Sequence, residues 1–523
     1  MRRLRRATVG CAISQWGGVH WPVRLAAGWA SVQGVAFTLG AAPRHRAESA
    51  WFILVAVALL QGFARSTARP SEIPPQVPGQ ADADSAASTP PAWVWPDRNL
   101  LGGFLVGSVL LYWPALHVGL LSDDFTLLAR AHDGLVGPSD WAFIRPLPLW
   151  LWQLMQRVSD AHMLPYALHA VNVVVHALNA ACVVCLALVW GLRVPDARLA
   201  GLLFLVSPLN VEAVTWASGV FDVSMTLWAL CAVQLMGQAA ARGQGALSVA
   251  GLVGLGLASK ETAVVVPVLC LISRGTRLFT NRTAVTALTV SVIGVVAYVG
   301  WRISLGLPSG LTLMPSGYAL KELVSRPFGA LALPVHAHVQ GAAILSTCLA
   351  LVWPLVVVWV ASPSARHERF RLSLKVVLWV QCSVLPVFTM FYVSDTLEGA
   401  RYLYLAGAAW AVLVASVLGH GDRHAEWAKT GRAVIQLAVI VGCCLLVRSH
   451  LTHWSHAGAL RDRVLAAAKA LPCRPVQVEG VPDNVAGAYV FRNGVADAVR
   501  LNEIDGPPCH VRWAGERFVI SEQ

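Results

Sequence analysis

Residues 164–190 read LPYALHAVNVVVHALNAACVVCLALVW and contain no Asp, Glu, Lys or Arg. A helix needs about 20 mostly apolar residues to cross a bilayer, so this stretch predicts a membrane-spanning helix. Comparable apolar runs lie on both sides of it, at 100–121, 199–238, 246–273, 284–306, 341–361, 372–394, 400–418 and 433–448. The run 199–238 is long enough for two helices, with a tip near Ser218 and Gly219. The sequence therefore predicts an all-α, polytopic integral membrane protein.

Composition supports this fold class. The chain has 523 residues, of which 56% are hydrophobic and only 13% are charged, against about 25% charged in soluble domains. Its net charge of +12 comes from short arginine clusters between apolar runs, without interleaved aromatic residues. Such clusters are typical of cytoplasmic loops, so we expect membrane lipids as partners and no nucleic acid.

The clusters also predict an orientation. They fall at alternate connections, which places these connections in the cytoplasm: Arg193/Arg198, Arg242, Arg274/Arg277/Arg282, Arg366/Arg369/Arg371 and Arg423/Lys429/Arg432. The other connections, and the chain from His450 onward, then lie outside the cytoplasm. The run at 246–259 is only about 21 Å long as a helix, shorter than the bilayer core, and suggests a shallow or re-entrant hairpin.

Four regions follow along the chain. Residues 1–64 contain two moderately apolar runs that are either spans or a signal-like region, and 65–98 form a Pro/Ala/Ser-rich linker. Residues 99–449 hold the multi-span domain, and 450–523 form a small extracytoplasmic tail. Cys473 and Cys509 are the only cysteines of that tail, and an oxidising compartment predicts a disulfide between them.

Polar residues at the outward ends of spans are the candidates for chemistry. Asp123 and Asp124 follow the first regular span directly, where two carboxylates are costly to place against lipid. A solvated loop start is the structural alternative, but an Asp pair can also supply a general base and a ligand for Mg²⁺ or Mn²⁺. The chain shows no ligand cluster that requires a metal, and no other cofactor is expected.

Other polar side chains are expected at the same face as substrate or phosphate ligands. These are Arg145, His169, Glu212, Asp222, Lys260, Glu261, Arg326, Arg401 and Tyr402. His169 shares a helix stripe with Asn172, His176 and Asn179, which favours hydrogen bonds between helices over ligand binding. Lys260 and Glu261 could form a local ion pair, or Lys260 could bind a phosphate.

The order of several motifs resembles a known family. SDDF at 122–125 is followed by IRPLPLWLWQL (144–154), ALHAVNVVVHALNA (167–180), LFLVSPLNVEAVTWASGVFDVSMTLWAL (203–230), ASKETAVVVPVL (258–269) and EGARYLYLAGAAW (398–410). This order resembles the protein O-mannosyltransferase-like branch of the GT-C glycosyltransferases. The likeness is to the membrane domain of the transmembrane, tetratricopeptide-containing mannosyltransferases and their bacterial relatives, over roughly 100–420.

The resemblance implies an inverting mannosyltransferase-like enzyme that uses a polyprenyl-phosphate monosaccharide, with Asp123 and Asp124 as its catalytic motif. The acceptor would be a hydroxyl of a protein, lipid or glycan. Arg401, Lys260 and Arg326 are the cations expected to hold the departing phosphate. Composition fits a bacterial inner membrane, with the active site and the tail in the periplasm. No tetratricopeptide repeats follow the membrane domain; the tail instead contains GVPDNVAGAYVFRNGVADAV (480–499), which suggests no role.

Two other functions remain open from sequence. A lipid or solute transporter would place charges near the bilayer midplane and show internal repeats, and neither is visible. A non-catalytic envelope assembly protein would keep the fold with a degenerate site.

Overall fold

The computed structural model describes residues 98–134, 144–242, 245–307, 317–332, 334, 366–419, 426–502, 504, 506–515 and 517–520. The N-terminal regions expected at 1–64 and 65–97 and the span expected at 341–361 lie outside these residues.

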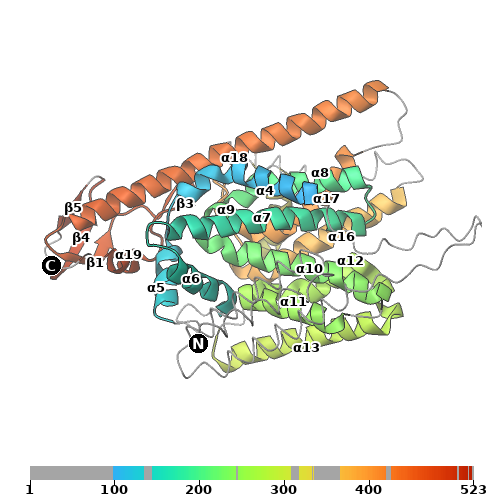
Figure 1. Ribbon diagram of the computed structural model, residues 1–523, viewed down its shortest axis with the longest axis horizontal. Coiled ribbons are helices and arrows are strands. Elements are labelled where there is room, and N and C mark those ends of the chain that lie inside the picture. The colour runs from blue at the N-terminus through green and yellow to red at the C-terminus, as the bar shows by residue number, and fades with distance from the viewer. Residues whose placement is uncertain are drawn as a thin grey trace, which may run out of the picture.

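The described chain is mainly helical. Its α-helices are α4 Arg98–Tyr112, α5 Asp123–His132, α6 Pro146–Val158, α7 Leu164–Val189, α8 Val194–Leu205, α9 Val211–Thr215, α10 Val220–Arg242, α11 Ala246–Ser259, α12 Val266–Arg274, α13 Arg282–Ser304, α14 Gly317–Ala332, α16 Arg366–Val384, α17 Tyr404–Leu418, α18 Glu426–Lys469 and α19 Val495–Leu501. Short 3-10 turns precede or follow several of them, among them η2 Trp113–His117, η3 Pro208–Asn210, η4 Ala217–Gly219, η5 Glu261–Val265 and η8 Ala400–Leu403. Figure 1 shows the long helices side by side along the longest axis of the molecule.

Seven segments within the described residues are long and apolar enough to cross a membrane, which confirms the multi-span prediction. They are Arg98–His117, Leu164–Val189, Ala217–Ala239, Arg282–Ser304, His367–Val387, Ala400–Leu418 and Ala433–Lys469. The segment 217–239 is 83% buried within its apolar window, whereas the windows of α13 and of 433–469 are only 17% buried. Exposed apolar side chains such as Ile293 and Val296 on α13 and Leu437 on α18 are what a lipid-facing surface requires.

An eighth span is formed if two bent helices are counted together. α8 and the segment Pro208–Thr215 meet at 47°. Pro208 cannot continue the hydrogen-bond ladder of α8, and the side chain of Asn210 donates to the Phe204 carbonyl at 2.7 Å, which satisfies one acceptor at the break. The chain then turns at η4, so the predicted tip near Ser218 and Gly219 is confirmed.

The short apolar helix expected at 246–259 is confirmed as α11. α11 has 14 residues, and η5 and α12 return from it. α11 packs against α10 and α13 instead of standing alone.

The expected boundary between the membrane domain and the tail, at 449/450, falls inside a helix. α18 is continuous over 44 residues, because the sequence after Arg448 contains no proline and is rich in Ala and Leu up to Lys469. A small domain follows it. Strands β1 (Arg474–Glu479) and β4 (Pro508–Trp513) are parallel, and β5 (Phe518–Ile520) pairs antiparallel with β4. β2 (Asn484–Val485) and β3 (Ala488–Tyr489) form a separate hairpin, and Cys473 and Cys509 are joined by a disulfide.

Candidate functional site

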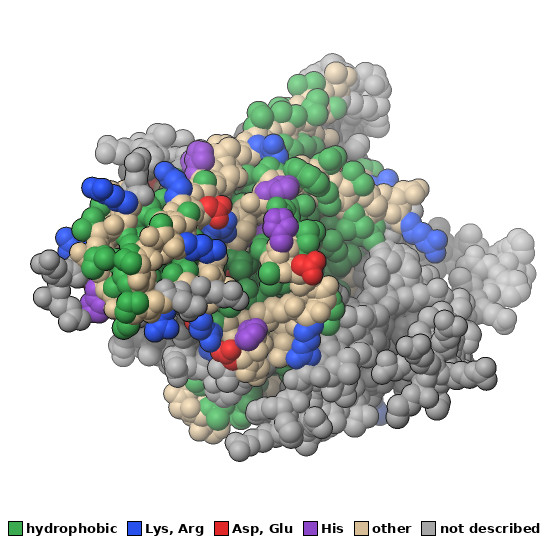
Figure 2. Space-filling model, turned by 60° about the vertical axis from the view of Figure 1, so that its left-hand side comes forward, with side chains coloured by type: hydrophobic (Ala, Val, Ile, Leu, Met, Phe, Trp, Pro, Cys, Tyr) green, Lys and Arg blue, Asp and Glu red, His purple; other side chains and the backbone are tan. Residues whose placement is uncertain are grey.

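Polar side chains from distant parts of the chain meet at the end of the bundle that carries the C-terminal domain. Each sits where a helix begins or ends: Asp123 and Asp124 in the first turn of α5, Glu212 in α9, Asp222 in the first turn of α10, and Arg401 in η8. Figure 2 shows acidic, basic and histidine side chains gathered on this face. Because these residues lie where helices begin or end, their charges are not in the middle of long apolar helices.

Asp124 is completely buried. Its Oδ2 accepts a 2.8 Å hydrogen bond from the Leu121 amide, and its Oδ1 accepts from both the amide and the hydroxyl of Ser218. Burial raises the pKa of this carboxyl to about 7, against the lowering effect of these hydrogen bonds. Oδ1 thus joins α5 to the 217–219 turn, and Oδ2 is held by the turn that precedes α5.

Asp123 is only partly buried, although it is the next residue along the chain. Its Oδ1 accepts a 2.6 Å hydrogen bond from Nδ2 of Asn493 and a longer one, 3.3 Å, from the Ser122 hydroxyl. Within the described residues, Oδ2 accepts no hydrogen bond. Of the predicted acidic pair, Asp123 is therefore the carboxylate that a substrate can reach.

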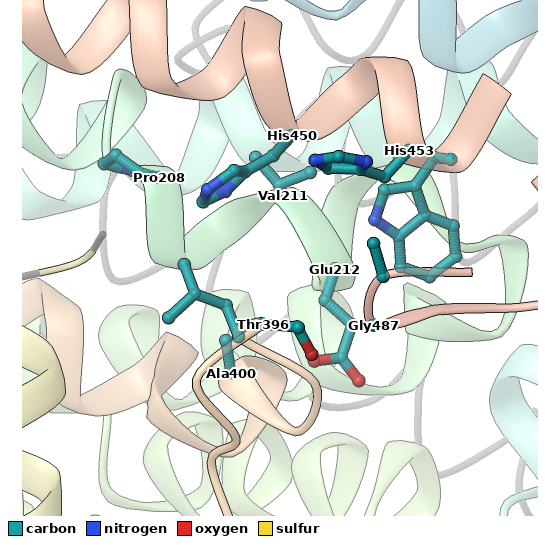
Figure 3. Close-up of a pocket in the computed structure, with 11 residues that line it drawn as sticks. Pro208, Val211, Glu212, Thr396, Ala400, His450, His453 and Gly487 are labelled. Carbon is teal, nitrogen blue, oxygen red and sulfur yellow. The ribbon is translucent and has the colours of Figure 1, made fainter. Parts of the chain in front are cut away.

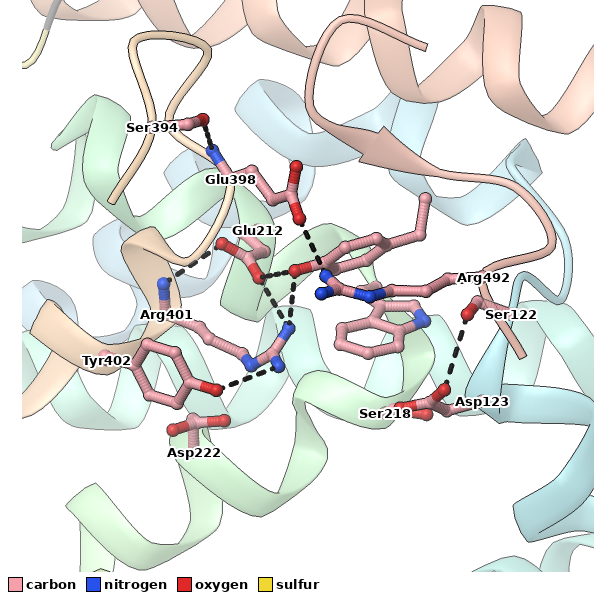
Figure 4. A network of polar contacts seen from close by, with 12 residues as sticks. Ser122, Asp123, Glu212, Ser218, Asp222, Ser394, Glu398, Arg401, Tyr402 and Arg492 are labelled. Atoms are coloured by element: carbon pink, nitrogen blue, oxygen red, sulfur yellow. Dashed lines mark hydrogen bonds and ion pairs between the residues drawn. The ribbon is translucent and has the colours of Figure 1, made fainter. Parts of the chain in front are cut away.

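Glu212 and Arg401 form a buried ion pair. Nη1 of Arg401 lies 2.6 Å from Oε1 of Glu212, and the Arg401 amide donates to Oε2 at 3.2 Å (Figure 4). The Tyr489 hydroxyl donates to Glu212 and accepts from Arg401, each at 3.2 Å. The guanidinium also lies 4.7 Å from the ring centre of Trp216, whose indole N–H donates to the Leu121 carbonyl. Trp216 thus connects this ion pair to the turn that precedes Asp123.

Lys260 and Glu261 do not pair with each other. Lys260 lies 2.5 Å from Asp222, and Glu261 accepts two hydrogen bonds from Arg145, of 2.9 and 2.6 Å. The backbone at Lys260 is extended, with φ −159° and ψ 138°, so consecutive side chains point to opposite sides. Burial raises the pKa of Glu261, but the charge and hydrogen bonds of Arg145 outweigh it and lower the pKa to about 2.

The three ion pairs make this cluster electrically neutral. Arg145, Lys260 and Arg401 are each matched by a carboxylate, from Glu261, Asp222 and Glu212 respectively. Lys260 also lies 5.4 Å from the ring centre of Tyr402, and a nitrogen of Arg401 lies 3.4 Å from its hydroxyl, so Tyr402 belongs to the cluster. Two of the cations expected to bind a phosphate therefore already have a carboxylate partner.

Two predicted ligands lie apart from the ion pairs. His169 is fully buried on α7, where its Nε2 donates to the Gly119 carbonyl at 3.1 Å. Asn172, on the same stripe, donates to the Trp216 carbonyl at 2.7 Å, which agrees with the interpretation of this stripe as interhelical hydrogen bonding. Arg326, on α14, lies over the ring of Tyr392 at 5.2 Å.

Sequence reasoning missed the residues that the C-terminal domain contributes. Tyr489, Arg492 and Asn493 come from the segment 480–499, which suggested no role. Arg492 donates to Glu398 at 2.7 Å, and Tyr489 and Asn493 reach Glu212 and Asp123 as described above. The available signal was a Gly-flanked run of aromatic and polar residues, GAYVFRNG, in the C-terminal tail.

A small pocket opens beside Glu212, between α9, the 396–400 loop, α18 and the β2–β3 turn (Figure 3). Its lining combines polar with apolar groups: Pro208, Val211, Glu212, Thr396, Leu397, Ala400, His450, His453, Trp454, Ala486 and Gly487. Among the described residues, no group of three or more His, Cys, Asp or Glu side chains is arranged to hold a metal ion. Asp123 and Asp124 accept hydrogen bonds from different residues.

Comparisons with known proteins give only distant likenesses. No family model and no curated protein matches the sequence. ArnT from Cupriavidus metallidurans, solved with undecaprenyl phosphate, is 14% identical, with a TM-score of 0.46 over 78% of this chain and 90% of ArnT. The Archaeoglobus fulgidus oligosaccharyltransferase, solved with a tethered acceptor peptide, is 12% identical, with a TM-score of 0.43 over 70% of this chain and 57% of that enzyme. At scores below 0.5 these likenesses assign neither activity nor ligands.

Proposed function

We propose that this protein is a GT-C-type membrane glycosyltransferase that moves a monosaccharide from a polyprenyl phosphate to a hydroxyl acceptor, with inversion. The observation that carries the proposal is the position and hydrogen bonding of the Asp123 carboxylate. It lies just after a membrane span, with one carboxylate oxygen held by Asn493 and the other open to a substrate. The order of motifs over 100–420 supports the same reaction.

Asp123 supplies the general base. Its Oδ2 takes the proton of the acceptor hydroxyl as the hydroxyl oxygen attacks the anomeric carbon from the face opposite the phosphate. The bond between the anomeric carbon and the phosphate oxygen breaks, and the electron pair leaves with the polyprenyl phosphate. Such base catalysis typically contributes about 10²–10⁴-fold. Asp123 is proposed for this role over Asp124, because Asp124 is completely buried and each of its oxygens already accepts a hydrogen bond.

The departing phosphate needs positive charge near the membrane surface. Arg401, Lys260 and Arg326 are the proposed cations, and Arg145 joins them because it lies in the same cluster. A guanidinium has five N–H donors, so Arg401 can keep its contact with Glu212 and still donate to a phosphate oxygen. Preorganised donors of this kind stabilise the charge that develops in the transition state.

The sugar, carrier and compartment are proposed from the sequence. Mannose follows from the family resemblance, and undecaprenyl phosphate and a bacterial inner membrane follow from composition. The basic connections support a periplasmic position for the cluster and the C-terminal domain. A protein, lipid or glycan hydroxyl is the acceptor. The charges at the helix ends favour this reaction over transport, which places them near the midplane.

The test is transfer by purified protein. Detergent-solubilised enzyme is incubated with radiolabelled polyprenyl-phosphate mannose, and release of labelled sugar from the carrier is followed with time. Asp123→Asn should fold and lose about two or more decades of rate. Asp160→Asn, which changes an exposed aspartate between α6 and α7, is the matched control and should retain full activity. Full activity in Asp123→Asn would show that this carboxylate is not the base. Failure of the wild type to consume any polyprenyl-phosphate sugar would reject the reaction itself.

A further inference from the structure

One segment of the C-terminal domain lies directly on the proposed site. It comprises the β2–β3 hairpin and the turn after it, residues 484–494, here called the tail hairpin. Its contacts reach residues that precede it by 88 to 371 positions, on α5, α9 and η8. Two of these contacts are hydrogen bonds to charged residues of the site, Glu212 and Arg401, and the third is to the Ser122 hydroxyl.

The first contact point is Tyr489, which is 3% exposed. Its ring lies between Trp216 and Trp454, with ring centres 4.7 and 6.2 Å away. Burial raises the pKa of its phenol, so the hydroxyl keeps its proton at neutral pH and donates to Glu212. This residue fixes the tail hairpin on the ion pair of Glu212 and Arg401.

The second contact point is the turn that carries Asn493. The Ser122 amide donates to the Val490 carbonyl at 2.8 Å, and the Asn493 amide donates to the Ser122 hydroxyl at 3.2 Å. Gly494 follows with φ +82°, and a Cβ there would lie 2.6 Å from the Ser122 carbonyl oxygen. Because Ser122 is bonded to both Val490 and the Asn493 amide, the turn is held beside Asp123, and the side chain of Asn493 reaches this carboxylate.

We infer that Asn493 is a positioning residue for Asp123, so that the C-terminal domain completes the active site instead of merely covering it. This inference rests on the proposed function. Asn493 donates through Nδ2 to Oδ1 of Asp123 and thereby directs Oδ2 toward the acceptor hydroxyl. A base whose carboxylate can rotate spends less time in a productive geometry, and small misplacements reduce catalytic rates strongly.

The test separates positioning from simple attachment of the domain. Asn493→Ala should lower kcat about ten-fold or more and leave KM for the polyprenyl-phosphate sugar within about two-fold, because the donor is bound elsewhere. Asn493→Asp has the same shape but places a second carboxylate beside Asp123. The two carboxylates then share a proton, so the acidic limb of the kcat profile should move upward by about one pH unit or more.

Asn502→Ala is the matched control. Asn502 lies in the same domain, and within the described residues its side chain donates to the Ala498 carbonyl of α19, away from Asp123, so this variant should keep the wild-type rate and pH profile. Thermal unfolding and the Cys473–Cys509 disulfide report whether each variant is folded. If both Asn493 variants misfold, Asp123→Glu examines the same geometry. This variant keeps a base but moves the carboxylate by one methylene. Full activity in Asp123→Glu would contradict the inference.

The outcomes also separate this inference from the proposed function. Loss of activity in Asp123→Asn, together with wild-type kcat and pH profile in folded Asn493→Ala and Asn493→Asp, would overturn the positioning role alone. Activity retained in Asp123→Asn would instead overturn the base assignment on which that role depends.

Discussion

The Ser218 amide donates a 2.8 Å hydrogen bond to Oδ1 of the fully buried Asp124, although 94 residues separate them. This bond joins the first turn of α5 to the turn between α9 and α10. It also distinguishes the surroundings of the two neighbouring aspartates, because each oxygen of Asp124 accepts a hydrogen bond, whereas within the described residues Oδ2 of Asp123 accepts none.

Asp124→Asn should destabilise the protein. The new amide group places N–H donors against the Leu121 or Ser218 donors, so at least one buried donor loses its partner, at a cost of about 1–3 kcal/mol. Thermal unfolding in detergent should show a lower midpoint for this variant than for Asp123→Asn. Equal midpoints in the two variants would show that the buried carboxylate is not a structural requirement.

Glu212 and Arg401 should be strongly coupled. Glu212→Gln and Arg401→Gln each leave a buried charge without its partner, which typically costs about 3–5 kcal/mol. The double variant removes both charges and should cost less than the sum of the single changes, measured as a double-mutant cycle of unfolding free energies. Arg492→Gln is the control, because the Arg492–Glu398 pair is more exposed and should contribute little. Additive single effects at 212 and 401 would contradict the coupling.

Glu261 should give the protein an acid-sensitive component of stability. Its folded pKa of about 2 is lower than its usual value, so its ion pair with Arg145 stabilises the fold fully above pH 4.5. That contribution is lost as the pH falls from 4.5 toward 2. The stability difference between wild type and Glu261→Gln should therefore shrink between pH 5 and pH 3, followed by thermal unfolding. A difference that is constant over this range would show that the ion pair does not control the titration.

The disulfide should hold the C-terminal domain in its folded form. Cys473 and Cys509 close a loop with a sequence separation of 36, for which chain entropy predicts about 3–4 kcal/mol. In Cys473→Ser, limited proteolysis should cut between residues 474 and 508 faster than in wild type, while the membrane helices stay intact.

Mass spectrometry of the native wild type should find both cysteines oxidised; two free thiols would refute the pairing.

The C-terminus should lie outside the cytoplasm. The basic residues before the apolar part of α18 place its beginning inside, so its end and the following domain face outward. A reporter that is active only in the cytoplasm should be silent when fused after Gln523, and one that requires an oxidising compartment should be active. The reverse pattern would mean that the number of spans differs by an odd number.

By itself, the sequence determined the architecture. Apolar runs of membrane length, the arginines between them and the tip near Ser218 are local signals, because a bilayer selects each span by its own length and hydrophobicity. The same signals predicted that the charged residues lie at the ends of helices, as Asp222 does in the first turn of α10. The end of α11 after 14 residues was also predictable from local composition.

Only the tertiary structure decided which of these residues act together. Asp123 and Asp124 have the same side chain and neighbouring positions, so no local pattern could show that one is buried under Ser218 and the other faces Asn493. Lys260 pairs with Asp222 instead of Glu261 because helix packing brings them together across 38 residues. Ion-pair partners and burial depend on how helices and the C-terminal domain pack, and that packing is a property of the whole chain.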